Sequence, residues 1–334
     1  MKLIAETAWH HEGNFLFMKN LVSQIVENTS VDILKMHITL DFDEYMDQSH
    51  YAYSKLRKMI FSKKQWEELI TIARKSKKEI MLLLNDTQAI DFGLSFNPEY
   101  VEIHSVCLND IFMLKKLKNN IQEKTKLVLG VGGTTINEIK NAINFLNHRN
   151  TILMFGFQNF PTKYEDVNLN KIRNIMEIFK DYDYGYADHT AGDSPHNELV
   201  TLLGAASGMK YVEKHVTTNF GENRIDWQAA ISLNMFNDLH KKIKILSKLN
   251  GDGSLSLNSG EIEYSVFGPM KKAAILTTNI SKEEILNFNN IKFIRTNQIS
   301  DMSQIDVLNV IGKKIITNLQ KGTVLMKKYF DRIE

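Results

Sequence analysis

Two short motifs place histidines where a metal ion could be bound. A DHT motif ends one apolar run, and an EKH motif lies within the next. Consecutive runs of an alternating strand and helix fold become neighbouring strands, so His189 and His215 can meet although they are distant in the sequence. Together with Glu6 or Glu213 they could hold a divalent metal that keeps open positions for a substrate. Ten histidines in 334 residues is an ordinary number, so a structural role for both is the alternative.

A lysine inside an apolar run is a second chemical signal. Lys35 lies within VDILKMHI, and a buried ammonium is costly unless an anion or a carboxylate faces it. It could face an anionic substrate, or it could form a structural salt bridge with Glu6 or Glu102. The GVGGTT motif opens a predicted helix and could cradle a phosphate with its backbone N–H groups, although glycine pairs also make simple tight turns.

Short apolar runs alternate with amphipathic stretches over about the first 250 residues, which is the pattern of repeated strand and helix units. Eight such runs predict a (β/α)8 barrel. A doubly wound open sheet is less favoured, because no GxGxxG turn follows the first run. The eight runs are LIAETA (3–8), VDILKMHI (31–38), EIMLLL (79–84), YVEIHS (100–105), KLVLGVG (126–132), ILMFGF (152–157), DYGYAD (183–188) and KYVEKHV (210–216).

In such a barrel the C-terminal ends of the strands surround the active-site mouth, so polar residues there carry the most functional information. We therefore expect one site to gather the polar residues and glycines at these ends. They are Glu6, His10, His11, Lys35, His37, His104, Ser105, Gly130, Gly132, Gly133, Gln158, Asn159, Asp188, His189, Glu213 and His215.

The composition is that of an ordinary globular protein. Hydrophobic residues make up 43% and charged residues 24%, with 41 basic against 39 acidic side chains, so nothing indicates disorder or a nucleic-acid partner. The single cysteine, Cys107, excludes an internal disulfide and fits a reducing compartment. The N-terminal residues do not resemble a signal peptide, and no apolar run is long enough to span a membrane. We expect a soluble, cytoplasmic protein.

The composition and the hydrophobic pattern of the sequence change after Leu249. NGDGSLSLNSGE is rich in Gly, Ser and Asn and predicts a linker. We expect a barrel domain over residues 1–250, a linker over 251–265 and a small domain over 266–334. A domain of about 70 residues is marginally stable alone, so we expect it to dock on a barrel, either its own or a partner's.

Several segments resemble the sialic acid synthase family, whose members condense phosphoenolpyruvate with an N-acylated amino sugar to nine-carbon 2-keto-3-deoxy acids. IAETAWHHEGN resembles that family's IAE-x-x-x-NH-x-G, DILKMH its AVKFQ, and FPTKYEDVNL its YPTPYEDVNL. YADHTAG resembles its YSDHT-x-G, VEKHVTTN its IEKH-x-T, and RIDWQAAI lies where it has PDH-x-x-S. ISKEEILNFNNIKFIRT and VIGKKIITNLQKGTVL resemble its C-terminal antifreeze-like (SAF) domain of the β-clip type. The matches run in the family's order through essentially the whole chain.

The resemblance implies a metal-dependent transferase for surface glycan biosynthesis. His189 and His215 would hold Mn2+ or Mg2+, which would polarise the sugar aldehyde. Glu6 and Glu213 would position water or move protons, and Asp226 would face the same pocket. The remaining substrate-binding residues that we predict are Lys35, His37, His104, Ser105, Gly130, Gly132 and Gln158, with Lys35 and Ser105 touching phosphoenolpyruvate.

The resemblance also implies a homodimer. The antifreeze-like domain of one chain would close over the barrel of the other, and Lys271 or Lys272 would meet the sugar.

The sequence departs from the family where phosphoenolpyruvate should bind. Glu102 stands at the family's strand-four lysine, Leu83 or its neighbour at a phosphate-binding hydroxyl, Phe160 at a tyrosine and Ala187 at a serine. The strand-five Leu-Ser-Thr-Gly becomes Leu-Gly-Val-Gly. Each lost charge-assisted bond is worth about 1.5–3 kcal/mol. The glycines of GVGGTT with its threonines could compensate, and His104 could replace the lysine.

Two alternatives follow from these departures. The first is an aldolase-type enzyme with a donor such as pyruvate. The second is a non-catalytic sugar-binding or partner-modulating paralogue, which the retained Glu6, Lys35, His189, Glu213 and His215 disfavour.

Overall fold

The computed structural model describes residues 1–156 and 159–331. The chain forms two compact units, Met1–Gly251 and Asp252–Glu334, each described here by itself. Within the described ranges, no helix combines the length and the apolar character needed to cross a membrane.

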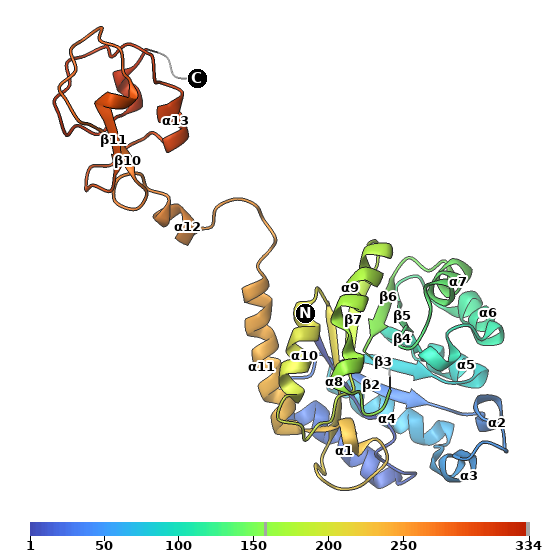
Figure 1. Ribbon diagram of the computed structural model, residues 1–334. Coiled ribbons are helices and arrows are strands. Elements are labelled where there is room, and N and C mark those ends of the chain that lie inside the picture. The colour runs from blue at the N-terminus through green and yellow to red at the C-terminus, as the bar shows by residue number, and fades with distance from the viewer. Residues whose placement is uncertain (157–158, 332–334) are drawn as a thin grey trace. The chain divides into compact units, whose positions relative to one another are not determined.

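The first unit is a closed barrel of eight parallel strands, as the sequence predicts (Figure 1). Each strand pairs with the next along the chain, and β1 pairs with β8 to close the barrel. A short ninth strand, β9 (Ile231–Ser232), extends the pairing of β8. The eight barrel strands are β1 (Lys2–Glu6), β2 (Ile33–Ile38), β3 (Glu79–Leu84), β4 (Tyr100–Ile103), β5 (Lys126–Gly130), β6 (Thr151–Phe155), β7 (Asp183–Asp188) and β8 (Tyr211–Thr217).

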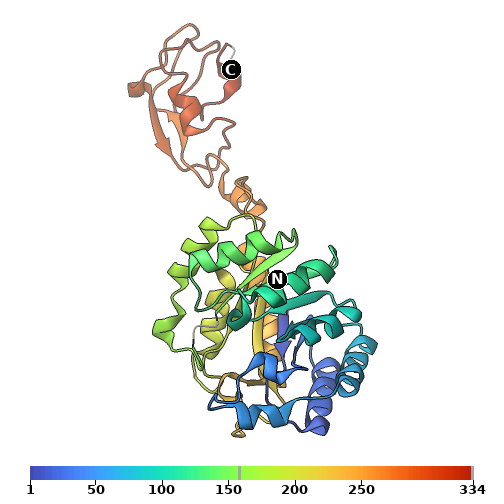
Figure 2. The ribbon, with the colours of Figure 1, turned by 90° about the vertical axis from the view of Figure 1, so that its right-hand side faces the viewer.

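Helices surround the strands of the barrel, and Figure 2 shows this outer layer of helices in a view turned by 90°. Helix α4 illustrates why they form: a Ser62 and Gln65 capping box starts it, and it buries Trp66 and Leu69 at helical spacing. The helices of this unit are α1 (Phe15–Asn28), α2 (Phe42–Tyr45), α3 (Tyr53–Leu56), α4 (Lys63–Lys75), α5 (Thr87–Ser95), α6 (Ile111–Asn120), α7 (Ile136–Leu146), α8 (Tyr164–Val167), α9 (Leu169–Ile178), α10 (Asn197–Ala206) and α11 (Leu233–Asn250). Short 3-10 helices follow at Arg57–Met59, Ser105–Cys107 and Trp227–Ala229.

Two buried apolar layers hold the barrel together. The larger layer lies between the strands and the helices, and the smaller one fills the barrel interior. Interior residues such as Ile4, Met81, Tyr100 and Tyr211 are at most 4% exposed. Because these apolar side chains fill the barrel interior, the polar residues at the C-terminal strand ends lie directly above a packed apolar core.

The second unit contains a two-stranded antiparallel sheet of β10 (Ala273–Leu276) and β11 (Ile291–Ile294). Its own buried core includes Leu286, Val310 and Leu325. Helix α12 (Ser259–Tyr264) lies inside the segment predicted as a linker, and α13 (Gln304–Leu308) and 3-10 helices at Phe288–Asn290 and Lys327–Tyr329 complete the unit. The resemblance of this unit to an antifreeze-like domain stays a prediction, as do the predicted domain boundaries.

Candidate active site

A cavity of about 330 Å³ lies at the C-terminal ends of the barrel strands. This is the end where a (β/α)8 barrel builds its active site. The structure brings eleven of the predicted site residues to its wall: Glu6, Lys35, His37, His104, Ser105, Gly130, Gly132, His189, Glu213, His215 and Asp226. Gln158 lies outside the described residues. Lys271 and Lys272 are exposed residues of the second unit, so their predicted contact with the sugar stays a prediction.

Glu6, His189 and His215 form a group that could hold a metal ion. One potential ligand atom from each lies within 4.8 Å of the others, and all three side chains are buried. The two imidazole rings meet edge to face with their centroids 4.7 Å apart. Two histidines and one carboxylate facing a cavity leave coordination positions open, which suits a divalent metal that must also bind a substrate.

The protonation of these side chains also fits a metal. The Nδ1 of His189 lies 2.9 Å from the carbonyl oxygen of Ala187, and because a carbonyl only accepts, Nδ1 carries the proton and Nε2 carries the lone pair. Burial lowers the pKa of His189 to about 4 and lowers that of His215 well below its ordinary value. Both rings are therefore neutral near pH 7, which is the form that binds metals.

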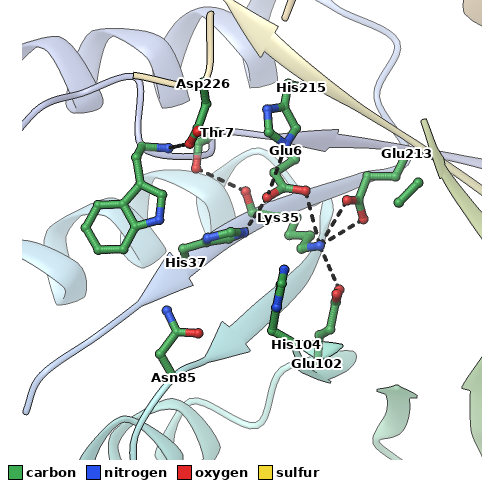
Figure 3. A network of polar contacts seen from close by, with 12 residues as sticks. Glu6, Thr7, Lys35, His37, Asn85, Glu102, His104, Glu213, His215 and Asp226 are labelled. Atoms are coloured by element: carbon green, nitrogen blue, oxygen red, sulfur yellow. Dashed lines mark hydrogen bonds and ion pairs between the residues drawn. The ribbon is translucent and has the colours of Figure 1, made fainter. Parts of the chain in front are cut away.

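The ammonium of Lys35 is surrounded by three carboxyl groups (Figure 3). Its Nζ lies 3.1 Å from Glu6 Oε2, 2.8 Å from Glu102 Oε2 and 3.0 Å from both oxygens of Glu213. The salt bridges to Glu6 and Glu102 are the ones the sequence suggested, and the one to Glu213 is additional. Burial lowers the pKa of Lys35, but the charges of Glu102, Glu213 and Glu6 outweigh this effect and raise it well above its ordinary value. Lys35 is therefore charged but already paired.

The three carboxyl groups differ in their protonation. Burial would raise the pKa of Glu6, but the charges of Lys35, His37 and His215 hold it well below the ordinary value. Burial and the neighbouring Glu6 raise the pKa of Glu213 well above its ordinary value, and burial raises that of Glu102. Like charges this close oppose each other's ionisation, which favours the ionised form of Glu6 and the protonated form of Glu213. The group thus contains both a base and an acid.

Two further polar residues border the same cavity. His37 lies two residues after Lys35 on β2, and its Nε2 contacts Oε1 of Glu6. Asp226 accepts a hydrogen bond from the backbone N–H of Trp9 at 3.0 Å, and its left-handed backbone, with φ of 64°, turns the chain there. Burial raises the pKa of Asp226 to about 6.

The substitution Asp226→Asn is expected to change how stability depends on pH. Folded Asp226 keeps its proton up to about pH 6, whereas the unfolded carboxyl loses it near its ordinary pKa of 3.8. The folded state therefore binds more protons between these values, and wild-type stability falls relative to the variant as the pH rises from about 4 to about 6. Urea unfolding of EDTA-treated proteins at several pH values measures this difference. Parallel pH profiles for the two proteins would show that Asp226 is not perturbed.

The structure bears on the two compensations that the sequence suggested. His104 does not replace a cationic lysine, because burial lowers its pKa to about 3 and its Nδ1 accepts a hydrogen bond from Val106 N–H. At the start of α7, after GVGGTT, Glu138 accepts hydrogen bonds from the N–H and the hydroxyl of Thr135 in a capping box, so these two donors are already paired. The predicted contact of the glycine N–H groups of this motif with a phosphate stays a prediction. The hydroxyl of Thr134 donates to the carbonyl of Val131 at 2.8 Å.

Among the cavity-wall residues whose side chains can form hydrogen bonds, sequence reasoning missed three, namely Trp9, Tyr45 and Asn85. Trp9 precedes the histidine pair of the first loop, and Asn85 directly follows the third apolar run, so their positions offered a signal. At that strand end the resemblance places Leu83 or its neighbour at the position of a phosphate-binding hydroxyl, and Leu83 is fully buried and does not border the cavity. Tyr45 comes from the short helix α2, and no sequence pattern points to it.

The chain is similar to known proteins over most of its length. An N,N'-diacetyllegionaminic acid synthase of Legionella pneumophila is 24% identical over 353 aligned residues, which cover 98% of this chain and 94% of the relative. The crystal structure of an N-acetylneuraminic acid synthetase from Leptospira borgpetersenii, in complex with citrate, has a TM-score of 0.70 at 21% identity and covers 78% of this chain and 88% of its own.

A putative spore coat polysaccharide biosynthesis protein E from Chromobacterium violaceum has a TM-score of 0.80 at 16% identity and covers 99% of this chain and 100% of its own. At these identities the solved structures show the fold alone. The sequence profile of the NeuB family matches residues 29–255, which include seven of the eight barrel strands and both histidine motifs. The chain belongs to the NeuB family.

Proposed function

We propose that this protein is a metal-dependent synthase that condenses phosphoenolpyruvate with an N-acylated amino sugar to a nine-carbon 2-keto-3-deoxy sugar acid. The observation that carries the proposal is the buried group of Glu6, His189 and His215 at the mouth of the barrel. Membership of the NeuB family and the similarity to a legionaminic acid synthase support it. We further propose that the product enters surface glycan biosynthesis and that the enzyme is a cytoplasmic homodimer.

In the proposed reaction, C3 of phosphoenolpyruvate bonds to the aldehyde carbon of the open-chain sugar. Water adds at C2, and phosphate leaves with cleavage of its C–O bond. A divalent metal held by Glu6, His189 and His215 would supply Lewis acidity toward the aldehyde oxygen. Glu213 holds a proton near the same position and would give it to the oxygen on which charge develops. The Lys35 ammonium would orient the donor carboxylate, with the hydroxyl of Ser105 on the same wall.

The test is a coupled assay with Mn2+, phosphoenolpyruvate and a panel of N-acylated mannosamine-like sugars. We expect release of inorganic phosphate in equal amount to a 2-keto acid, and loss of both signals when EDTA removes the metal. No turnover with any sugar, together with no protection of the protein by phosphoenolpyruvate, would overturn the proposal.

A second candidate is favoured by Glu102. Lys35 is the one cation among the described residues of the cavity wall, and Glu102 Oε2 lies 2.8 Å from it. The single ammonium on this wall is already paired with Glu6 and Glu102, so little uncompensated positive charge faces a multiply charged phosphate donor. Pyruvate carries only one charge. In an aldol reaction its C3 would lose a proton and bond to the aldehyde carbon, and the aldehyde oxygen would take up a proton.

A donor screen separates these functions. The same sugars and Mn2+ are incubated with phosphoenolpyruvate or with pyruvate, and the 2-keto-3-deoxy acid is measured by mass spectrometry. Product from pyruvate alone would establish the aldolase. No product from either donor, with Mn2+ and sugar still bound, would instead indicate a non-catalytic sugar-binding protein.

A further inference from the structure

A fully buried ion pair lies directly behind the two histidines. Lys214 Nζ lies 3.1 Å from Asp188 Oδ2, and both side chains are 0% exposed. Neither residue borders the cavity. Side chains alternate between the two faces of a strand, so Lys214 points toward the helices while its neighbours Glu213 and His215 point into the barrel. The pair therefore belongs to the layer outside the site but is adjacent in sequence to His189 and His215.

The pair connects the two strands that carry the histidines. Asp188 on β7 and Lys214 on β8 are direct partners in the register of these parallel strands. The pair adds a charged contact to the backbone hydrogen bonds at the level where the rings of His189 and His215 meet. Movement of β7 relative to β8 would separate these rings, and the ion pair opposes this movement.

Asp188 also holds the loop that carries His189. Its Oδ1 accepts hydrogen bonds from the N–H of Thr190 at 2.9 Å and from the hydroxyl of Thr190 at 2.8 Å. Its Oδ2 accepts a further bond from the hydroxyl of Thr201 on α10. Asn197, one turn earlier on α10, donates to the carbonyl oxygens of Thr190 and Ala191 at 3.1 and 3.0 Å. The backbone on both sides of His189 is thus fixed to β8 and to α10.

We propose that the Asp188 and Lys214 ion pair is a positioning device that sets the geometry of the metal-binding histidines, in addition to its role in folding. A hydrophobic pair of similar size often stabilises a protein as well as a buried ion pair does, so stability alone does not account for these charges. Outer residues that orient metal ligands commonly change metal affinity by about 10- to 100-fold when they are replaced. The inference rests on the metal site of the proposed function.

The test uses a double variant, Asp188→Asn with Lys214→Met. Removing both charges leaves no unpaired buried charge, so this variant is expected to fold, whereas Lys214→Met alone leaves a buried carboxylate and serves as the comparison for folding. We expect the double variant to bind Mn2+ about 10- to 100-fold more weakly than the wild type. Electron paramagnetic resonance of free Mn2+ measures this affinity. Circular dichroism checks that the fold is retained.

A second ion pair, at the opposite end of the barrel, serves as the control. Lys2 on β1 and Glu79 on β3 form an ion pair there, remote from the cavity wall. The double variant Lys2→Met with Glu79→Gln should keep wild-type Mn2+ affinity. Wild-type affinity in a folded Asp188→Asn and Lys214→Met variant would overturn the positioning role.

A second measurement separates failure of this inference from failure of the metal site. In ring 1H–15N spectra of metal-free protein, the wild-type His189 signal should report a proton on Nδ1, the atom that donates to Ala187. The Asp188→Asn and Lys214→Met variant should lose this single form and give an averaged signal. If the wild type binds no Mn2+, the proposed function fails, and these spectra still decide the positioning role. An unchanged His189 signal would overturn it.

Discussion

Replacing His215 by alanine is expected to abolish tight Mn2+ binding and to lower kcat/KM by about three orders of magnitude or more. His215 supplies one of the two imidazole ligands, and its ring meets that of His189 at 4.7 Å between centroids. Without it, Glu6 and His189 leave too few protein ligands for a stable site. A polarising metal contributes several kcal/mol to the transition state, and about 1.4 kcal/mol corresponds to one factor of ten in rate.

Calorimetric titration with Mn2+ and the coupled assay measure the two losses in His215→Ala. The control is His50→Ala, because His50 is an exposed residue of a loop that does not border the cavity. It should keep both properties. If His215→Ala binds Mn2+ as the wild type does, the three residues are not the metal centre, and the proposed function loses its main support.

Replacing Lys35 by methionine is expected to destabilise the protein by about 3–5 kcal/mol near neutral pH, because the change leaves buried carboxyl groups without their shared cation. Glu6, Glu102 and Glu213 all lie within 3.1 Å of the lysine Nζ. Without it, burial and mutual repulsion raise the pKa of the carboxyl groups further. The folded variant then binds more protons than its unfolded state, so its stability recovers as the pH falls toward about 5.

Urea unfolding of metal-free Lys35→Met at neutral and acidic pH measures this recovery. Lys126→Met is the control, because Lys126 is also a strand lysine but donates a hydrogen bond to the hydroxyl of Tyr211 at 2.9 Å. Its effect should be smaller and nearly independent of pH. A loss of stability in Lys35→Met that is equal at both pH values would contradict the charge assignment.

The barrel could be predicted because its signals are local. Apolar runs of strand length alternate with stretches of helical spacing, and eight such repeats without a GxGxxG turn after the first run favour a closed parallel barrel over an open sheet. Capping boxes were equally readable: the Thr135 and Glu138 pair that occupies the start of α7 follows the S/T-x-x-E pattern.

The details of the site could not be predicted, because they depend on register and burial. Glu6 aligns with Lys35 on one side and with His215 on the other, and this alignment follows from the pairing of β1 with β2 and β8. The contact of Glu213 with Lys35 joins strands that are not adjacent, so the sequence could suggest partners for the lysine but not this third one. Likewise, His104 is uncharged because burial lowers its pKa, and its residue type alone does not predict that burial.

The alternation along β8 makes this strand unusually intolerant of length changes. Glu213 and His215 face the barrel interior, and Lys214 lies between them facing Asp188 and the helices. Insertion or deletion of a single residue before this motif would exchange the two faces, because side chains alternate with a period of two. A single insertion or deletion would turn the ammonium of Lys214 into the site and turn Glu213 and His215 away from it. Functional descendants of this gene should therefore vary in length only in the loops around β8.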